Sequence, residues 1–113
     1  MSTTPGRAYF DKRIELLKAG KIDEMVDAGY NDNAEIVDFN GTVRGKQAIK
    51  DHFNQHFPMM GGVEVKSIDQ IVETDDALFV QITVVTGAWG QISTYEGFVL
   101  RNGKADYHFT AVK

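Results

Sequence analysis

The chain has 113 residues, of which 42% are hydrophobic and 25% are charged, and its formal net charge is -4. This ordinary composition excludes disordered and collagen-like chains, and the length suits one domain over residues 1–113 with a single core. Cysteine is absent, which excludes disulfides, zinc–thiolate sites and cysteine nucleophiles, and the scattered Lys and Arg residues of an acidic chain argue against a nucleic-acid partner.

The sequence carries no sign of membrane insertion or export. The longest apolar run, residues 77–85, contains Gln81 and Thr83 and falls far short of the ~20 apolar residues of a membrane helix. The first residues, 1–7, lack the apolar core of a signal peptide. We therefore expect a cytoplasmic protein with no membrane partner.

The first half of the chain predicts helices and a short hairpin. A helix is predicted from Thr4-Pro5, where Thr4 can cap the helix and Pro5 can occupy its first position, to the terminating Gly20. The elements expected next are a helical stripe over 22–29, a loop at 31–33, a strand at 34–39, the Asn40-Gly41 hairpin turn, a strand at 42–44, and a helix over 46–57 that Pro58 ends.

The second half of the chain predicts sheet. Candidate strands are separated by short polar or glycine-rich turns, and they cover residues 63–72, 77–86, 91–101 and 104–112. Strand–turn–strand repeats at this spacing predict an antiparallel meander. Because the strands follow a block of helices, we expect an α+β fold with the helices on one face of the sheet.

Two stretches of the sequence carry a resemblance to a known family. They are residues 30–39, YNDNAEIVDF, and residues 43–53, VRGKQAIKDHF. Together with the element order they resemble the nuclear transport factor 2-like superfamily, in its SnoaL-like and ketosteroid-isomerase-like branch, and the resemblance covers nearly the whole chain. It implies a curved antiparallel sheet wrapped around helices as a cone with an internal pocket: three N-terminal helices with a short hairpin, then four long strands.

The resemblance also implies partners and activity. Members of this branch usually form homodimers through the outer face of the sheet, and many bind a small apolar molecule. Some of them isomerise, cyclise or dehydrate that molecule, while many have no known activity, because one fold hosts many functions. We expect no cofactor, since the sequence shows neither a dinucleotide-binding pattern followed by a helix nor a phosphate loop.

Two acidic residues are candidates for catalysis. The resemblance places Asp38 at the catalytic aspartate of ketosteroid isomerases, where a buried carboxylate can act as general base. The alternative is a strand-end aspartate that prepares the Asn40-Gly41 turn. Glu96 matches the position of an acid that binds the oxyanion in these isomerases; alternatively, it faces solvent.

His108 in the last predicted strand is the third candidate for catalysis. The resemblance favours an inward His108, which could form an acid–base pair with Asp38. A slip of one residue in the register of this strand would instead turn the side chain outward. With His108 inward, Tyr107 and Phe109 lie on the outer face, where a partner subunit could cover them.

The first predicted helix departs from the isomerase pattern. Ketosteroid isomerases have a catalytic tyrosine on this helix. In this sequence Arg13 occupies the matching position, and Tyr9 lies one turn earlier on the same side. An inward Arg13 would favour a carboxylate ligand, or would pair with Asp38 or Glu96. The alternative is a surface arginine whose stem covers the edge of the core.

Further candidates for contact with a ligand are aromatic or imidazole side chains. Tyr30 is expected to end the second helix as a pocket wall, and His56 is expected near the middle of the apolar stripe of the third helix; the remaining candidates are Phe53 and Phe98. His52 and His56 are four residues apart, a spacing found in metal sites, but no acid lies between them, so we expect no metal.

Two hypotheses therefore remain open. The first is a cofactor-independent enzyme acting on a small carbonyl compound, with Asp38 as general base, and with Glu96, His108 or Tyr9 as the group that stabilises the oxyanion or donates a proton. The second is a non-catalytic dimeric module that binds a small hydrophobic or carboxylate ligand.

Overall fold

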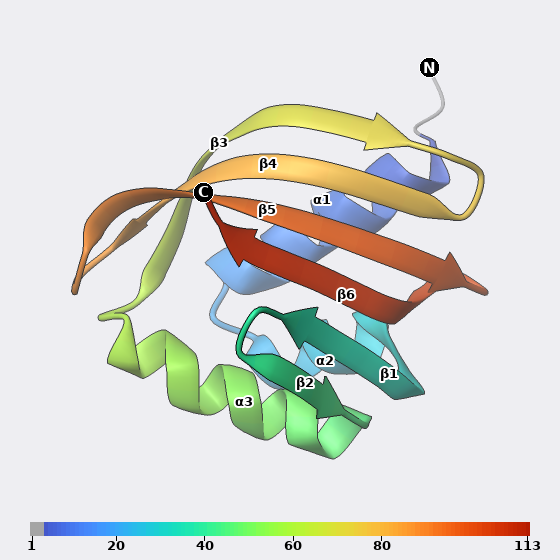
Figure 1. Ribbon diagram of the computed structural model, residues 1–113, viewed down its shortest axis with the longest axis horizontal. Helices are drawn as coiled ribbons and strands as arrows, with labels where there is room; N and C mark the ends of the chain where they lie inside the picture. The colour runs from blue at the N-terminus through green and yellow to red at the C-terminus, as the bar shows by residue number, and fades with distance from the viewer. Residues whose placement is uncertain (1–3) are drawn as a thin grey trace.

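Three helices and a six-stranded sheet make up the computed structural model of the protein (Figure 1), which describes residues 4–113. The elements are α1 (Pro5–Lys18), α2 (Ile22–Gly29), β1 (Tyr30–Asp38), β2 (Gly41–Arg44), α3 (Lys46–Met59), β3 (Val63–Glu73), β4 (Ala77–Thr86), β5 (Gly90–Arg101) and β6 (Lys104–Val112). The predicted order of helices, hairpin and four long strands is confirmed. Residues 1–3, which begin the N-terminal segment considered for a signal peptide, lie outside the described residues.

The sheet has the strand order β2-β1-β6-β5-β4-β3, and β3 to β6 form the predicted antiparallel meander. The expectation of a wholly antiparallel sheet is wrong at one pairing, because β1 lies parallel to β6, with Ile36 opposite His108. These two strands are not joined by a hairpin. The long connection through β2, α3 and the strands β3 to β5 allows β1 to enter the sheet in the same direction as β6.

Strand β1 begins earlier than the sequence predicted. Residues 31–33 were expected in a loop and Tyr30 at a helix end, yet β1 starts at Tyr30. The cause is tertiary: the Asn31 amide nitrogen donates to the Arg101 and Lys104 carbonyl oxygens at 3.1 and 3.2 Å and to Asp106 Oδ1 at 2.8 Å. These bonds attach a polar segment to the β5–β6 turn.

Helix α3 ends later than the sequence predicted. Pro58 was expected to end it at Phe57, but the helix continues to Met59. A proline in the last turn removes a single hydrogen-bond donor, which the helix tolerates. The chain leaves the helix at Gly61, where φ is 72°, and the amide of Gly62 donates to the Phe57 carbonyl oxygen at 3.0 Å.

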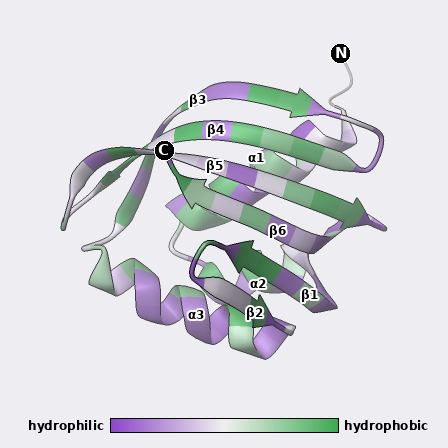
Figure 2. Ribbon diagram, viewed as in Figure 1, coloured by the Kyte–Doolittle hydropathy of each residue, from purple (hydrophilic) through white to green (hydrophobic). Residues whose placement is uncertain are grey.

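The core lies between the inner face of the sheet and the helices. Alternation along the strands, visible as changes of colour in Figure 2, turns Val80, Phe98 and His108 inward, whereas Phe79 and Phe109 stay exposed. Helix α1 crosses behind β4 and β5 in Figure 1, and its Phe10 ring lies 6.2 Å from the Phe98 ring. Within residues 4–113, none of the helices combines the length and hydrophobicity that a membrane span requires.

Candidate functional site

A line of hydrogen-bonded side chains crosses the core from α1 to β5. The Arg13 Nη1 atom donates to the Tyr30 hydroxyl at 2.9 Å, the Tyr30 hydroxyl lies 2.8 Å from His108 Nδ1, and His108 Nε2 lies 2.7 Å from Glu96 Oε1. The Thr110 hydroxyl donates to the other carboxylate oxygen of Glu96 at 2.6 Å. We call these five residues the polar chain.

Sheet register brings the polar chain together. Phe98 lies opposite His108 and Glu96 opposite Thr110 on the paired strands β5 and β6, and the period of two puts all four side chains on the inner face. His108 is 2% exposed, so the slip in register considered from the sequence does not occur. Its ring also stacks on Phe98, with 4.3 Å between centroids.

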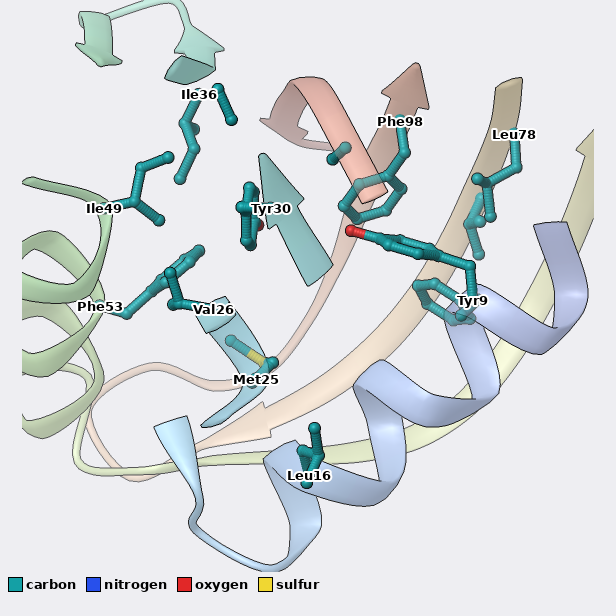
Figure 3. Close-up of a cluster of buried hydrophobic side chains, with 14 of the residues drawn as sticks. Tyr9, Leu16, Met25, Val26, Tyr30, Ile36, Ile49, Phe53, Leu78 and Phe98 are labelled. Carbon is teal, nitrogen blue, oxygen red and sulfur yellow. The ribbon is translucent and has the colours of Figure 1, made fainter. Parts of the chain in front are cut away.

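Tyr30 reaches the polar chain from the junction of α2 and β1. Its ring is fully buried, 6.2 Å from the Phe53 ring of α3. In Figure 3, Tyr30 lies between the α3 side chains Ile49 and Phe53 and the Phe98 ring of β5. The start of β1 at Tyr30 therefore places the phenol between α1 and β6.

Donors and acceptors assign one direction to the polar chain. A guanidinium only donates, so the Tyr30 oxygen accepts from Arg13 and its proton is donated to His108 Nδ1. His108 then carries its proton on Nε2 and donates it to the Glu96 carboxylate. A neutral imidazole beside an ionised carboxylate satisfies every bond, and no buried side-chain nitrogen or oxygen within residues 4–113 lacks a partner.

The electrostatics of the polar chain agree with this assignment. Burial lowers the pKa of His108 below its ordinary value, although Glu96 opposes the shift. Burial alone would raise the pKa of Glu96, but the hydrogen bonds from His108 and Thr110 outweigh burial and lower it. Burial raises the pKa of Tyr30 to about 12, so the phenol stays protonated at neutral pH.

Arg13 points into the molecule, so the alternative prediction of a surface arginine is wrong. Its guanidinium carbon lies 5.7, 5.6 and 5.1 Å from the ring centroids of Tyr30, Phe53 and Phe98. This geometry permits cation–π attraction. Among the side chains of residues 4–113, no carboxylate forms an ion pair with Arg13, so the pairing considered with Asp38 or Glu96 is not direct.

The Tyr9 ring packs beside the aromatic rings that surround Arg13. The ring lies 5.2 Å from the Phe98 ring, while the hydroxyl donates to the Gly29 carbonyl oxygen at 2.8 Å. Burial raises the pKa of Tyr9 above its usual range, so this phenol stays protonated. Tyr9 therefore attaches α1 to the end of α2.

Asp38 lies apart from the polar chain. Its Oδ1 atom accepts a hydrogen bond from the Asn40 backbone N–H at 2.8 Å, as expected for an aspartate that prepares the turn. No hydrogen bond joins Asp38 to Glu96 or His108 in the described part of the chain. The charge of Asp38 does act on His52 of α3. The pKa of His52 is lowered by burial and by the neighbouring His56, and Asp38 partly opposes this shift.

The predicted orientation of His56 is wrong. His56 is exposed, and its Nδ1 atom lies 2.9 Å from the His52 carbonyl oxygen. The β1–β2 hairpin packs on α3, on which His52 is half-buried, whereas His56, one turn later, is exposed. Residues 4–113 contain no group of three or more His, Cys, Asp and Glu side chains placed to hold a metal ion.

Two hollows adjoin the cluster around Arg13. The smaller has a volume of about 90 Å³ and is lined by side chains of α1 and α2, including Tyr9 and Arg13, and by the turn at Gly103. The larger has a volume of about 330 Å³ and lies between the three helices and the start of β3, with Phe53 in its wall. The space between α1 and the sheet is itself filled by the rings of Tyr9, Phe10 and Phe98.

The structure thus brings together seven of the nine residues singled out from the sequence, which are Tyr9, Arg13, Tyr30, Phe53, Glu96, Phe98 and His108. Asp38 and His56 lie outside. Sequence reasoning missed Thr110 as a partner of Glu96. The available signal was the period of two, which puts Thr110 on the same face as His108.

Comparisons with known proteins agree on the fold. A family model described as a SnoaL-like domain matches residues 7–108. TerC, a structure co-crystallised with polyporic acid, has a TM-score of 0.82 and 20% identity, over 97% of this chain and 92% of TerC. A nuclear transport factor 2-like protein of unknown function from Burkholderia pseudomallei has a TM-score of 0.82 and 14% identity, over 98% and 92% of the two chains.

A third similar structure is a de novo designed protein with a curved β-sheet, with a TM-score of 0.79 and 17% identity, over 100% of this chain and 88% of the design. At these identities the likeness shows the fold alone. Among curated proteins, no sequence relative is found.

Proposed function

Because the chain belongs to the SnoaL-like domain family, we propose that it binds a small carbonyl compound beside Arg13 and moves a proton on it, without a cofactor. The reaction would be an isomerisation, cyclisation or dehydration. The observation that carries the proposal is the polar chain, which joins a guanidinium to an ionised carboxylate through a phenol and a neutral imidazole.

The polar chain contains the groups that such a reaction needs. Arg13 uses one N–H on Tyr30, and its other N–H groups are donors for a carbonyl oxygen that becomes an enolate. Tyr30 is buried, so in this proposal the ligand displaces part of the ring packing to reach its oxygen. As the Tyr30 oxygen takes a proton from the neighbouring carbon, its own proton passes to His108 Nδ1, and Glu96 stabilises the imidazolium. Reversal of these steps returns the proton to the same carbon or to another one.

Asp38 has no part in this proposal, because its carboxylate accepts the Asn40 N–H. A small organic ligand has a precedent in TerC, which was co-crystallised with polyporic acid. A cytoplasmic location, and a protein without nucleic-acid or membrane partners, remain predictions from the sequence.

A second candidate function is a non-catalytic dimeric module that binds a small hydrophobic or carboxylate ligand. One observation favours it: every buried polar side-chain atom in the described residues already has a partner. A fully satisfied network can act purely as a rigid part of the core. The exposed aromatic residues of the outer sheet face support a homodimer in either case.

Proton exchange distinguishes the two candidates. A thermal-shift screen of small ketones, enones and carboxylates would identify binders, whose C–H groups next to the carbonyl are then followed by NMR in deuterium oxide. We expect exchange with the wild-type protein, and a loss of at least about 100-fold in Tyr30→Phe and Glu96→Gln. Tyr107→Phe, on the exposed face, and Asp38→Asn serve as matched controls that should exchange normally.

Two results would contradict the catalytic proposal. Binding without any exchange by the wild-type protein would favour the non-catalytic module. Exchange that persists in both Tyr30→Phe and Glu96→Gln would exclude the polar chain as the proton path, and loss of exchange in Asp38→Asn would return the role of base to Asp38.

A further inference from the structure

The larger hollow has an apolar lining and lies outside the polar chain. Its volume of about 330 Å³ lies in the range of small-molecule sites. Its lining includes Leu17 and Ile22 from the first two helices, Phe57 from α3 and Val63 from β3. The polar side chain in its wall is Asn54, whose amide already donates to Asp23 Oδ1 at 2.8 Å. The hollow therefore suits an apolar body.

Phe53 belongs both to the wall of this hollow and to the aromatic surroundings of the Arg13 guanidinium. Phe53 lines the hollow, and its ring lies 5.6 Å from the Arg13 guanidinium carbon and 6.2 Å from the Tyr30 ring. Phe53 also stacks on Phe57, which lines the same hollow, with 5.2 Å between centroids and 17° between planes. A planar ring in the hollow can extend this stack.

The charge near Phe53 selects the chemistry of the ligand. Arg13 lies against aromatic rings, and no carboxylate of residues 4–113 pairs with it. A planar guanidinium in such surroundings favours a carboxylate, which it binds through two parallel hydrogen bonds. A neutral amide would accept fewer of these bonds, and a cation would be repelled.

We propose that the hollow between the three helices holds the planar apolar body of the ligand, and that the ligand carries a carboxylate that reaches Arg13 past Phe53. This inference rests on the proposed function, because it takes Arg13 as the binding group for a ligand oxygen. It adds the class of ligand, an aryl or alkenyl carboxylate, and assigns Phe53 to control of access to Arg13.

Cinnamate and its neutral isostere cinnamamide test the ligand class on the wild-type protein. Methyl NMR resonances of Leu17, Ile22 and Val63 report on occupancy of the hollow. We expect both compounds to shift these resonances, and cinnamate to bind at least about tenfold more tightly, because charge-assisted hydrogen bonds are the stronger ones.

Three substitutions test the route to Arg13. We expect Arg13→Met to abolish the preference for cinnamate and Arg13→Lys to keep part of it. Phe53→Trp changes the wall that both ligand rings contact and places a larger ring beside Arg13, so it should weaken cinnamate by a larger factor than cinnamamide and reduce the preference for cinnamate. Phe39→Leu, at a side chain that is 97% exposed in the β1–β2 turn, is the control and should change neither. Thermal unfolding establishes that each variant is folded.

Equal affinity of the wild-type protein for the two compounds would overturn the carboxylate assignment, and shifts confined to residues outside the hollow, or none at all, would overturn the site. Both measurements use binding alone. The binding results therefore stand even if no proton exchange is found. Conversely, proton exchange that depends on Tyr30 would still support the proposed function if the binding results contradict the ligand class.

Discussion

At the scale of single residues, the protonation of His108 decides the direction of the polar chain. A neutral His108 accepts from Tyr30 and donates to Glu96. A protonated ring would carry hydrogen on both nitrogens, and the Tyr30 proton would then lose its acceptor. The buried imidazole is therefore the group at which pH acts on this core.

Acid should destabilise the protein through His108. Its pKa in the folded state lies below the ordinary value of 6.5, so the unfolded state takes up the proton first, and the free energy of unfolding falls as pH drops below about 6.5. Glu96, whose folded-state pKa is also lowered, adds a second loss of stability below about 4.5. Urea unfolding measured between neutral and acidic pH gives this slope directly.

Substitution of single histidines assigns that slope. We expect His108→Gln to flatten the pH dependence between neutral pH and about 5. His56→Gln should have a smaller effect, because His56 is exposed and acts on the pKa of His52 only through its charge. His52, whose pKa is also lowered, contributes in the same direction, so the comparison is one of slopes. A His108→Gln protein with the wild-type slope would show that His108 is not the group responsible.

At the scale of elements, two connections meet backbone to backbone. The link from α3 to β3 passes Gly61, and the turn from β4 to β5 passes Gly87; a Cβ atom added at Gly87 would lie 2.6 Å from the Gly61 carbonyl oxygen. Beside this contact, the Ala88 amide donates to the Met60 carbonyl oxygen at 2.9 Å. The contact ties the end of α3 to the sheet, next to the larger hollow.

Gly87→Ala should therefore destabilise the fold by about 1–3 kcal/mol, because backbone atoms would have to move apart. Gly6→Ala is the matched control. A Cβ atom there also meets a near neighbour, but that neighbour is the flexible Glu73 carboxylate, so we expect little change. Urea unfolding of both variants measures the difference, and equal stabilities would show that the backbone contact is unimportant.

At the scale of the whole molecule, the outer face of the sheet presents aromatic side chains to solvent. Phe79 and Tyr95 stack at 5.9 Å between centroids, and Tyr107 and Phe109 stack at 6.0 Å. Gly97 lies opposite both Phe79 and Phe109, and so separates the two pairs on the strands. An exposed apolar patch of this kind is typical of an interaction surface, which supports the proposed homodimer.

Charge on this face should dissociate the dimer. We expect the wild-type protein to run as a dimer at micromolar concentration in light scattering, and the double variant Phe79→Glu, Phe109→Glu to run as a monomer, because two carboxylates per subunit would be desolvated at the interface. Met59→Glu, at an exposed position at the end of α3, is the control and should stay dimeric. A monomeric wild-type protein would contradict the proposal.

Local patterns in the sequence determined the element order, the meander and the inner face of β5 and β6. The period of two put Glu96 and Phe98 on one face, and the turns set where each strand ends, because both features depend on residues close together in the chain.

Contacts between distant residues were decided by the tertiary structure alone. Arg13 and Tyr30 are 17 residues apart and Tyr30 and His108 are 78 apart, so no local pattern shows that a phenol bridges the guanidinium and the imidazole. The sequence could equally place Arg13 at the surface and Asp38 in the pocket. Two features settled these positions: the packing of the Arg13 guanidinium against aromatic rings, where Tyr30 accepts its hydrogen bond, and the bond from the Asn40 N–H to Asp38 at the end of β1.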